Sequence, residues 1–458
     1  YEQAPLYTWI MWLAVQLLGP TIIAVGLVKY TLVFLIHAFT YLAGRQAIRD
    51  PRLQVIAGLA PMTLYPIGWR LHEADTYGIL STVCMMAFAW AVLWLLRERR
   101  PVAYLILGLS LGAGLLSSGF FGLGALALLL ALPFAPAGRR ALLHWAFPLA
   151  LLLAALLVLP YALWIFEQGQ AWFDRVANVL GQTLPPEVRD GWFVGGYKVF
   201  ESFVIALFPF HIIFCVIFFY TLRPLPKGAV AGDDVGRVLW AYLPIVLGLF
   251  LLAVWILYIH RLNPFRVYPA VVPLTLLFLW RVDHFGLRPA PLRWAWLIFA
   301  ILVVVVVQAR FQHIQAGPAF CKVCRMQAPY PDVAELLRAE AGYGGDGTII
   351  AGDNYIAGNF RVQFPDARIL TPRYPEVVPP LPPEGATGPC LVVWHNDMRE
   401  GDRERFDTLL AEREIVLPPA EQIPLREVEV QHTPRIVMPN RTIQIRYYLS
   451  AEPIGTCG

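Results

Sequence analysis

The chain has 458 residues, of which 58% are hydrophobic and only 15% are charged, and its mean hydropathy is +0.57. A soluble domain of this size needs far less apolar surface, so the composition excludes an ordinary globular protein and predicts a lipid-facing surface. The net charge of +4 comes from basic residues scattered between apolar blocks, without a basic stripe or interleaved aromatic residues, which argues against nucleic acid as a partner.

The first apolar block, residues 5–19, is too short to cross a bilayer comfortably and ends at Gly19-Pro20. It is predicted to form a helix that lies near the membrane interface. The chain begins at Tyr1 without a methionine, and no signal-peptide pattern precedes this block. We therefore expect that an N-terminal segment is absent from this sequence.

The apolar blocks that follow are roughly 17 to 25 residues long, the length at which a helix crosses a hydrocarbon core of about 30 Å. They predict a mainly α-helical polytopic membrane bundle with about ten spans over residues 1–309. The predicted spans are 21–44, 53–70, 76–96, 102–117, 119–135, 142–166, 199–222, 238–259, 267–280 and 291–309.

Loops and span ends that are rich in basic residues alternate with loops that have few. By the positive-inside rule, the basic set is predicted to be cytoplasmic. It contains Arg45, Arg49 and Arg52; Arg97, Arg99 and Arg100; Arg139 and Arg140; Arg223, Lys227 and Arg237; and Arg281, Arg288 and Arg293. The other set is then extracytoplasmic, and the chain is predicted to be a multi-pass protein of the bacterial inner membrane. This set contains residues 1–20, 71–75, 117–119, 167–198, 260–266 and everything after 310.

Residues 310–458 are predicted to form a small extracytoplasmic α/β domain, because short β-rich runs alternate with amphipathic stretches. The expected helices are 331–342 and 399–414, and the expected strands are 348–351, 367–370, 390–394 and 441–449. No glycine-rich phosphate loop opens any of these helices, so no nucleotide site is predicted.

Four of the six cysteines, Cys321, Cys324, Cys390 and Cys457, lie in this tail. In an exported domain these four thiols could form two disulfides. Cys321 and Cys324 could alternatively form a local disulfide or stay unpaired, and a metal site would require the other two cysteines close by.

Ionisable side chains gather at the predicted external ends of the spans. They are Glu2, His72, Glu73, Asp75, Lys198, His260, Arg261 and Arg266, with Tyr268 beside them. Such groups could bind a metal or an anionic phosphate, or act as a general base on an acceptor hydroxyl. The alternative is simple solvation at the membrane surface. His211, within an apolar run, is predicted to be a hydrogen-bonded histidine of the bundle and not a ligand.

Several motifs occur in the order found in polytopic C-type glycosyltransferases, the bacterial relatives of protein mannosyltransferases and lipid A aminoarabinose transferases. Residues 2–9 (EQAPLYTW) resemble the E-x-P-P-L-x-x-W segment of that family, and residues 72–75 (HEAD) resemble its external acidic motif. Residues 104–119 resemble its Y-x-x-x-G-x-x-x-G-x-x-x-L-S/T-K-G segment, and residues 266–277 resemble R-Y-x-x-P-x-x-P-L. In the tail, residues 353–366 resemble its external C-terminal domain.

This resemblance implies an enzyme that uses a polyprenyl-phosphate sugar as donor and a lipid, glycan or protein as acceptor at the external face. By the same resemblance, Glu2 is a catalytic carboxylate, Asp75 is a supporting acid, and Arg266 with Tyr268 lines the donor pocket. Glu2 is sometimes a metal ligand in the family, so a divalent metal held by Glu2 and His260 is one expectation.

The sequence also departs from the family. The external loop that bears the family's principal catalytic acid would lie before Tyr1, and the two lysines that would grip the donor phosphate fall at Gln3 and Ser118. Arg261, Arg266 or Lys198 could replace these lysines, because arginine recognises phosphate well. A diverged member with altered or lost activity is the other interpretation.

The competing hypothesis is a non-catalytic polyprenyl-lipid transporter or a scaffold for envelope glycan assembly. A secondary transporter would more often show repeated halves and ionisable groups near the midplane of the membrane. Because the sequence has no internal repeat and its charged groups gather at one face, the glycosyltransferase is favoured.

Overall fold

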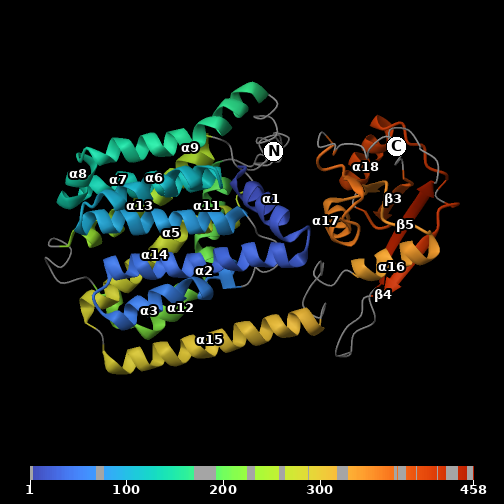
Figure 1. Cartoon of the computed structure of the whole chain (residues 1–458). Coiled ribbons are helices and arrows are strands. Elements are labelled where there is room, and N and C mark those ends of the chain that lie inside the picture. The colour runs from blue at the N-terminus through green and yellow to red at the C-terminus, as the bar shows by residue number, and fades with distance from the viewer. Residues whose placement is uncertain are drawn as a thin grey trace. The chain divides into compact units, whose positions relative to one another are not determined.

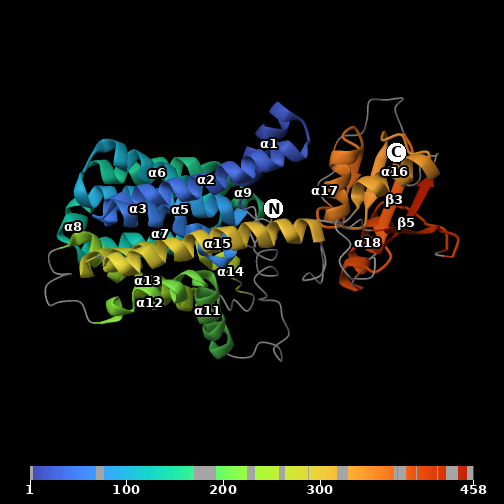
Figure 2. The same ribbon diagram turned by 90° about the horizontal axis from the view of Figure 1, so that it is seen from below.

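The computed structural model describes residues 4–68, 77–169, 192–223, 233–256, 262, 264–286, 288–316, 329–375, 379, 388–398, 400–419, 421–429, 442–450 and 457. The chain divides into two compact units (Figures 1 and 2). The first contains Tyr1–Ala14 and Val25–Val307, and the second contains Val15–Ala24 and Gln308–Gly458. The assignment of residues 1–309 and 310–458 to separate functional domains stays a prediction.

The helices from α1 to α15 lie wholly or mostly in the first unit. In chain order they are α1 Leu6–Leu18, α2 Ile22–Ala47, α3 Pro51–Leu59, α4 Tyr65–Gly68, α5 Tyr77–Arg97, α6 Pro101–Leu115, α7 Gly119–Ala131, α8 Pro136–Leu142, α9 Ala146–Gln168, α11 Trp192–Leu207, α12 Phe210–Ile217, α13 Asp234–Ile256, α14 Pro264–Phe285 and α15 Pro289–Ala316. The short 3₁₀ helices are η1 Ala60–Thr63, η3 Leu132–Phe134 and η4 Phe219–Leu222.

Within the described residues, α2, α5, α9, α13 and the part of α15 up to Gln308 are long and apolar enough to cross a membrane. A sixth span results if α7 and α8, which are bent by 116° relative to each other, form one crossing. The predicted count of about ten spans is therefore not confirmed. Prolines explain part of the difference: Pro61 lies in η1 between α3 and α4, and Pro209 separates α11 from α12, so two predicted spans are broken segments.

Helix α5 forms the centre of the first unit. In the most apolar stretch of α5, 89% of the residues are buried. In the corresponding stretches of the other helices, the buried share is 11% for α9 and 17% for both α2 and α15. A helix that is apolar on all sides and buried belongs to the interior of a bundle, whereas exposed apolar helices face hydrocarbon. Figure 1 shows α5 lying between α2 and the pair α6 and α7.

The glycines of the segment 104–119 allow α6 to approach α9 closely. A Cβ on Gly108 would lie 2.6 Å from the carbonyl oxygen of Ala150, and a Cβ on Gly112 would lie 2.8 Å from the Leu157 side chain. Small residues at such spacing are typical of closely packed membrane helices. Tyr104, at the start of the same segment, donates its hydroxyl to the Ala141 carbonyl at 2.9 Å. The segment thus packs α6 closely against α8 and α9.

The second unit contains a five-stranded mixed sheet with the order β2-β1-β3-β5-β4. Its strands are β1 Thr348–Ala351, β2 Arg368–Leu370, β3 Cys390–His395, β4 Leu425–Glu429 and β5 Thr442–Ser450. Strands β2, β1 and β3 are parallel, whereas β5 is antiparallel to both β3 and β4. All four predicted strands are confirmed, and β4 is additional.

Helices cover both faces of this sheet. α16 Tyr330–Glu340 and α17 Asn354–Gln363 pack on one face through residues such as Leu337 and Phe360, and α18 Glu400–Glu412 packs on the other through Phe406. The predicted helices at 331–342 and 399–414 correspond to α16 and α18. The unit is therefore a layered α/β domain, as the sequence predicts.

A disulfide joins Cys390 on β3 to Cys457 near the C-terminal end. This pair confirms one of the disulfides expected from the four cysteines of the tail. Cys321 and Cys324 lie outside the described residues. Cys84 and Cys215, in the first unit, are free thiols.

Candidate functional site

The turn between α6 and α7 is the starting point of the candidate site. Ser118 caps α7, because its hydroxyl accepts a hydrogen bond from the Phe120 backbone N–H at 3.3 Å. The backbone N–H of Leu6 donates to the carbonyl of Leu116 at 3.0 Å, and Ala4 is buried. The chain directly after Gln3 therefore lies against this turn.

The start of α5 lies beside the start of α1. The rings of Tyr7 and Tyr77 have centroids 5.1 Å apart, and the hydroxyls of Thr8 and Tyr77 share a hydrogen bond at 3.2 Å. Tyr77 closely follows Asp75 in the sequence. Tyr77, two residues after Asp75, is thus in direct contact with Tyr7 and Thr8, which lie on the first turn of α1.

The start of α14 supplies the cation of the site. The Arg266 guanidinium carbon lies 5.6 Å from the centroid of the Phe120 ring, within the range of a cation–π contact. Phe120 in turn stacks on Phe250 of α13, with ring centroids 6.3 Å apart. Tyr268, two residues further along α14, is only 1% exposed. Because Phe120 follows the Ser118 cap, the α6–α7 turn lies next to both the N-terminal segment and Arg266.

The structure places only some of the predicted site residues near this turn. Arg266, Tyr268 and Ser118 lie on elements that meet at this turn, whereas Lys198 on α11 forms an ion pair with Glu201 at 2.6 Å. Five others lie outside the described residues, and their roles stay predictions. They are Glu2, Gln3, Asp75, His260 and Arg261.

Sequence reasoning missed Phe120 and Tyr77, which join the elements of the site. Their signal was weak, because aromatic residues are common in apolar spans and only contacts between helices distinguish these two. Ser118 was identified as a position for gripping phosphate, and the structure gives its hydroxyl a local role as a helix cap.

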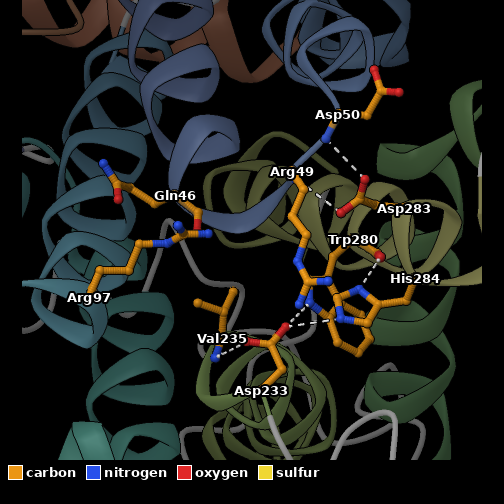
Figure 3. Close-up of polar contacts among 9 residues, drawn as sticks. All are labelled: Gln46, Arg49, Asp50, Arg97, Asp233, Val235, Trp280, Asp283 and His284. Carbon is orange, nitrogen blue, oxygen red and sulfur yellow. Dashed lines mark hydrogen bonds and ion pairs between the residues drawn. The ribbon is translucent and has the colours of Figure 1, made fainter.

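A second polar cluster lies at the other end of α14 (Figure 3). The carboxylate of Asp283 accepts hydrogen bonds from the backbone N–H groups of Arg49 and Asp50, at 2.9 and 3.1 Å. Asp233 accepts from the Trp280 indole N–H at 2.5 Å, and its carboxylate lies 3.3 Å from Nε2 of His284. These contacts tie the ends of α2, α13 and α14 together.

Hydrogen bonds join the five basic loops at this end. Arg97 Nε donates to the Gln46 carbonyl at 2.6 Å, as Figure 3 shows, and the Ala137 N–H donates to Asp234 at 3.2 Å. Arg281 Nε donates to the Thr221 carbonyl at 2.6 Å. The basic loops therefore share one end of the bundle, as their alternation predicts, while the side of the membrane that this end faces stays a prediction.

The candidate site and the basic loops are well separated. At a rise of about 1.5 Å per residue, Arg266 and Asp283 lie roughly 26 Å apart along the axis of α14. This distance is close to the thickness of a hydrocarbon core, about 30 Å. The two clusters consequently belong to opposite ends of the bundle.

A metal site is not seen in the part of the chain that the structure describes, because no three His, Cys, Asp or Glu residues there lie close enough to hold an ion. Glu2 and His260, the predicted ligands, are outside that part. Their metal-binding role stays a prediction.

The sequence comparisons find similarity to glycosyltransferases. Residues 2–164 match the family model described as dolichyl-phosphate-mannose-protein mannosyltransferase. The lipopolysaccharide core galacturonosyltransferases RgtA and RgtB of Rhizobium johnstonii are 28% and 25% identical to the chain. Each match covers 86% of the chain, with 77% of RgtA and 78% of RgtB.

Solved structures show the same fold. ArnT from Cupriavidus metallidurans bound to undecaprenyl phosphate matches over 97% of this chain and 88% of its own, with a TM-score of 0.53 and 12% identity. The apo form gives a TM-score of 0.54, also at 12% identity, over 98% of this chain and 88% of its own. At this identity the likeness concerns the fold.

Proposed function

We propose that this chain, a multi-pass membrane protein of the polytopic C-type glycosyltransferase superfamily, transfers a sugar from a polyprenyl-phosphate donor to a lipid or glycan acceptor at the extracytoplasmic face. One observation carries the proposal: the start of α14 with Arg266, the α6–α7 turn and the chain following Gln3 meet at one end of the bundle. This arrangement brings a cation close to the described residues that follow Gln3.

The reaction requires a base and a cation on opposite sides of the anomeric carbon. Glu2, assisted by Asp75, would remove the proton from the acceptor hydroxyl as its oxygen forms a bond to that carbon. The bond from the same carbon to the phosphate oxygen breaks, and polyprenyl phosphate leaves with the bonding electrons. Arg266 would stabilise the negative charge that develops on the departing phosphate. The sugar is transferred with inversion, because one displacement occurs.

Two features support an extracytoplasmic location of the site. The basic loops gather at the other end of the bundle, and basic loops are generally cytoplasmic. The Cys390–Cys457 disulfide favours an oxidising compartment for the second unit, which follows α15 in the chain. The relatives are named for galacturonic acid and the lipopolysaccharide core. A polyprenyl-phosphate uronic acid and a core oligosaccharide acceptor are therefore the first pair to test.

The test uses the purified chain in proteoliposomes with a panel of polyprenyl-phosphate sugars and a core-type glycolipid acceptor. Mass spectrometry of the lipid extract would follow both products, and we expect glycosylated acceptor and free polyprenyl phosphate in equal amounts. A lipid transporter or a scaffold would yield neither product. Absence of both products across the whole panel, with folded protein, would therefore contradict a glycosyltransferase.

A further inference from the structure

A cavity of about 340 Å³ lies between α11, α12, α13 and α14. This volume is at the lower end of the range of ligand sites, about 300 to 1,000 Å³. Most of its wall is apolar, with Phe210 from α12 and Leu274, Leu277 and Phe278 from α14. The wall thus suits a hydrocarbon chain.

The cavity is distinct from the candidate active site. Its lining on α14 runs from Leu274 to Arg281. At about 1.5 Å per residue, Arg281 lies roughly 22 Å along α14 from Arg266. Arg281 also contacts the carbonyls of Thr221 and Arg223, at the end where the basic loops gather. This end of the cavity is therefore near the depth of lipid headgroups.

Two residues that line the cavity each have a buried hydrogen-bonding atom without a partner. These atoms are Nδ1 of His211 on α12 and Nε1 of Trp240 on α13. The prediction that His211 is hydrogen-bonded is thus wrong for this nitrogen. Buried polar atoms in folded proteins nearly always have a partner, and a lone indole N–H surrounded by apolar groups is costly. An acceptor atom of a ligand would satisfy the Trp240 N–H.

Arg281 brings a positive charge to the same cavity. Its Nε and Nη2 donate to the carbonyls of Thr221 and Arg223, and its guanidinium lies 5.5 Å from the centroid of the Trp240 ring. Carbonyls are neutral acceptors, and none of the ion pairs between described residues involves Arg281. A charge at a largely apolar wall favours an anionic partner.

We infer that this cavity binds an anionic phospholipid of the bilayer, with its phosphate at Arg281 and Trp240 and the first part of one acyl chain along Leu277 and Phe278. A lipid fits better than a soluble anion, because apolar side chains surround the cavity. On α12, Ile212 is 48% exposed and Val216 is 69% exposed, as expected for a surface that faces hydrocarbon. The bound lipid would tie α12 to α13 and α14.

The test is native mass spectrometry of the full chain released from nanodiscs that contain equal amounts of phosphatidylglycerol and phosphatidylcholine. We expect phosphatidylglycerol to remain bound in preference to phosphatidylcholine. Trp240→Phe keeps the ring and removes the N–H, and it should weaken phosphatidylglycerol binding about tenfold, the effect of one good hydrogen bond. Arg281→Gln should abolish the preference for the anionic lipid.

Two control variants make the result specific. Trp255→Phe changes an exposed tryptophan on the same helix as Trp240, and Arg293→Gln changes an exposed arginine on α15, so neither should alter lipid retention. Equal retention of the two phospholipids by the wild type, or unchanged binding in Trp240→Phe, would overturn the inference. Displacement of phosphatidylglycerol by polyprenyl phosphate at equal concentration would overturn the assignment to a phospholipid.

Discussion

Replacing Arg266 by alanine is expected to lower kcat/KM for sugar transfer by about 10²- to 10³-fold, the usual effect of removing one group that stabilises developing negative charge. The structure places this guanidinium against Phe120, beside the α6–α7 turn, where the elements of the candidate site meet. Its loss would leave the departing phosphate without its main cation. Initial rates in proteoliposomes, measured over a range of donor concentrations, would provide the value.

Further variants distinguish charge from packing. Arg266→Met keeps an unbranched apolar stem against Phe120 but removes the charge, so it should be nearly as impaired as alanine. Arg266→Lys keeps the charge but loses the planar fork, so it should retain part of the activity. Arg293→Ala, an exposed arginine on α15, is the matched control and should behave as the wild type. If Arg266→Met retained most of the activity, the arginine would have only a packing role.

Replacing Asp75 by asparagine is expected to lower kcat by about 10²-fold or more, in the range found for loss of a general acid or base. The amide keeps the size of the carboxylate and removes its charge, so the fold should persist. Glu73→Gln changes a neighbouring carboxylate and should have little effect, because the resemblance assigns the supporting role to Asp75 alone. Single-turnover rates for the three proteins would separate chemistry from product release.

Wild-type activity in Asp75→Asn would remove this residue from the site. An equal loss in Glu73→Gln would show that the whole acidic segment 72–75 is sensitive to substitution, without a special role for Asp75. Thermal unfolding monitored by tryptophan fluorescence would verify that each variant remains folded.

Much of the fold follows from the sequence because lipid imposes a strong pattern on it. Hydropathy alone located α2, α5, α9, α13 and α15, since a spanning helix needs a long apolar run. It could not foresee that Pro209 would divide one predicted span into α11 and α12, because a proline in a membrane helix can also be accommodated as a kink.

The second unit shows a different limit of prediction from sequence. Its buried strands were evident as short apolar runs, but β4, with the sequence LREVE, alternates with charged residues at a sheet edge and gave no clear signal. Helix α17 was missed although Asp353 caps it, with its carboxylate accepting from the N–H groups of Tyr355 and Ile356. A single capping residue before a mixed polar stretch is a weak indication of a helix.

Part of the candidate site could also be predicted from the sequence. Motif order pointed to Arg266 and the Ser117-Ser118-Gly119 turn, and the structure connects them through Phe120. The pattern could not reveal that connection, because it depends on how α7 and α14 pack in space. Nor could it reveal the unpartnered N–H of Trp240, since burial without a hydrogen bond is a property of the packed bundle.

The proposed function requires that the acidic segment 72–75 and the start of α14 meet in one place, and thiol cross-linking measures this most directly. Cysteines would be introduced at Asp75 and Arg266, in a chain that keeps only the native pair Cys390 and Cys457, and the protein would be reconstituted in a bilayer. A short bifunctional thiol reagent should link positions 75 and 266 efficiently. It should fail to link 75 to a cysteine at Asp283, at the far end of α14. Absence of the first cross-link, or equal yields for both pairs, would contradict the account.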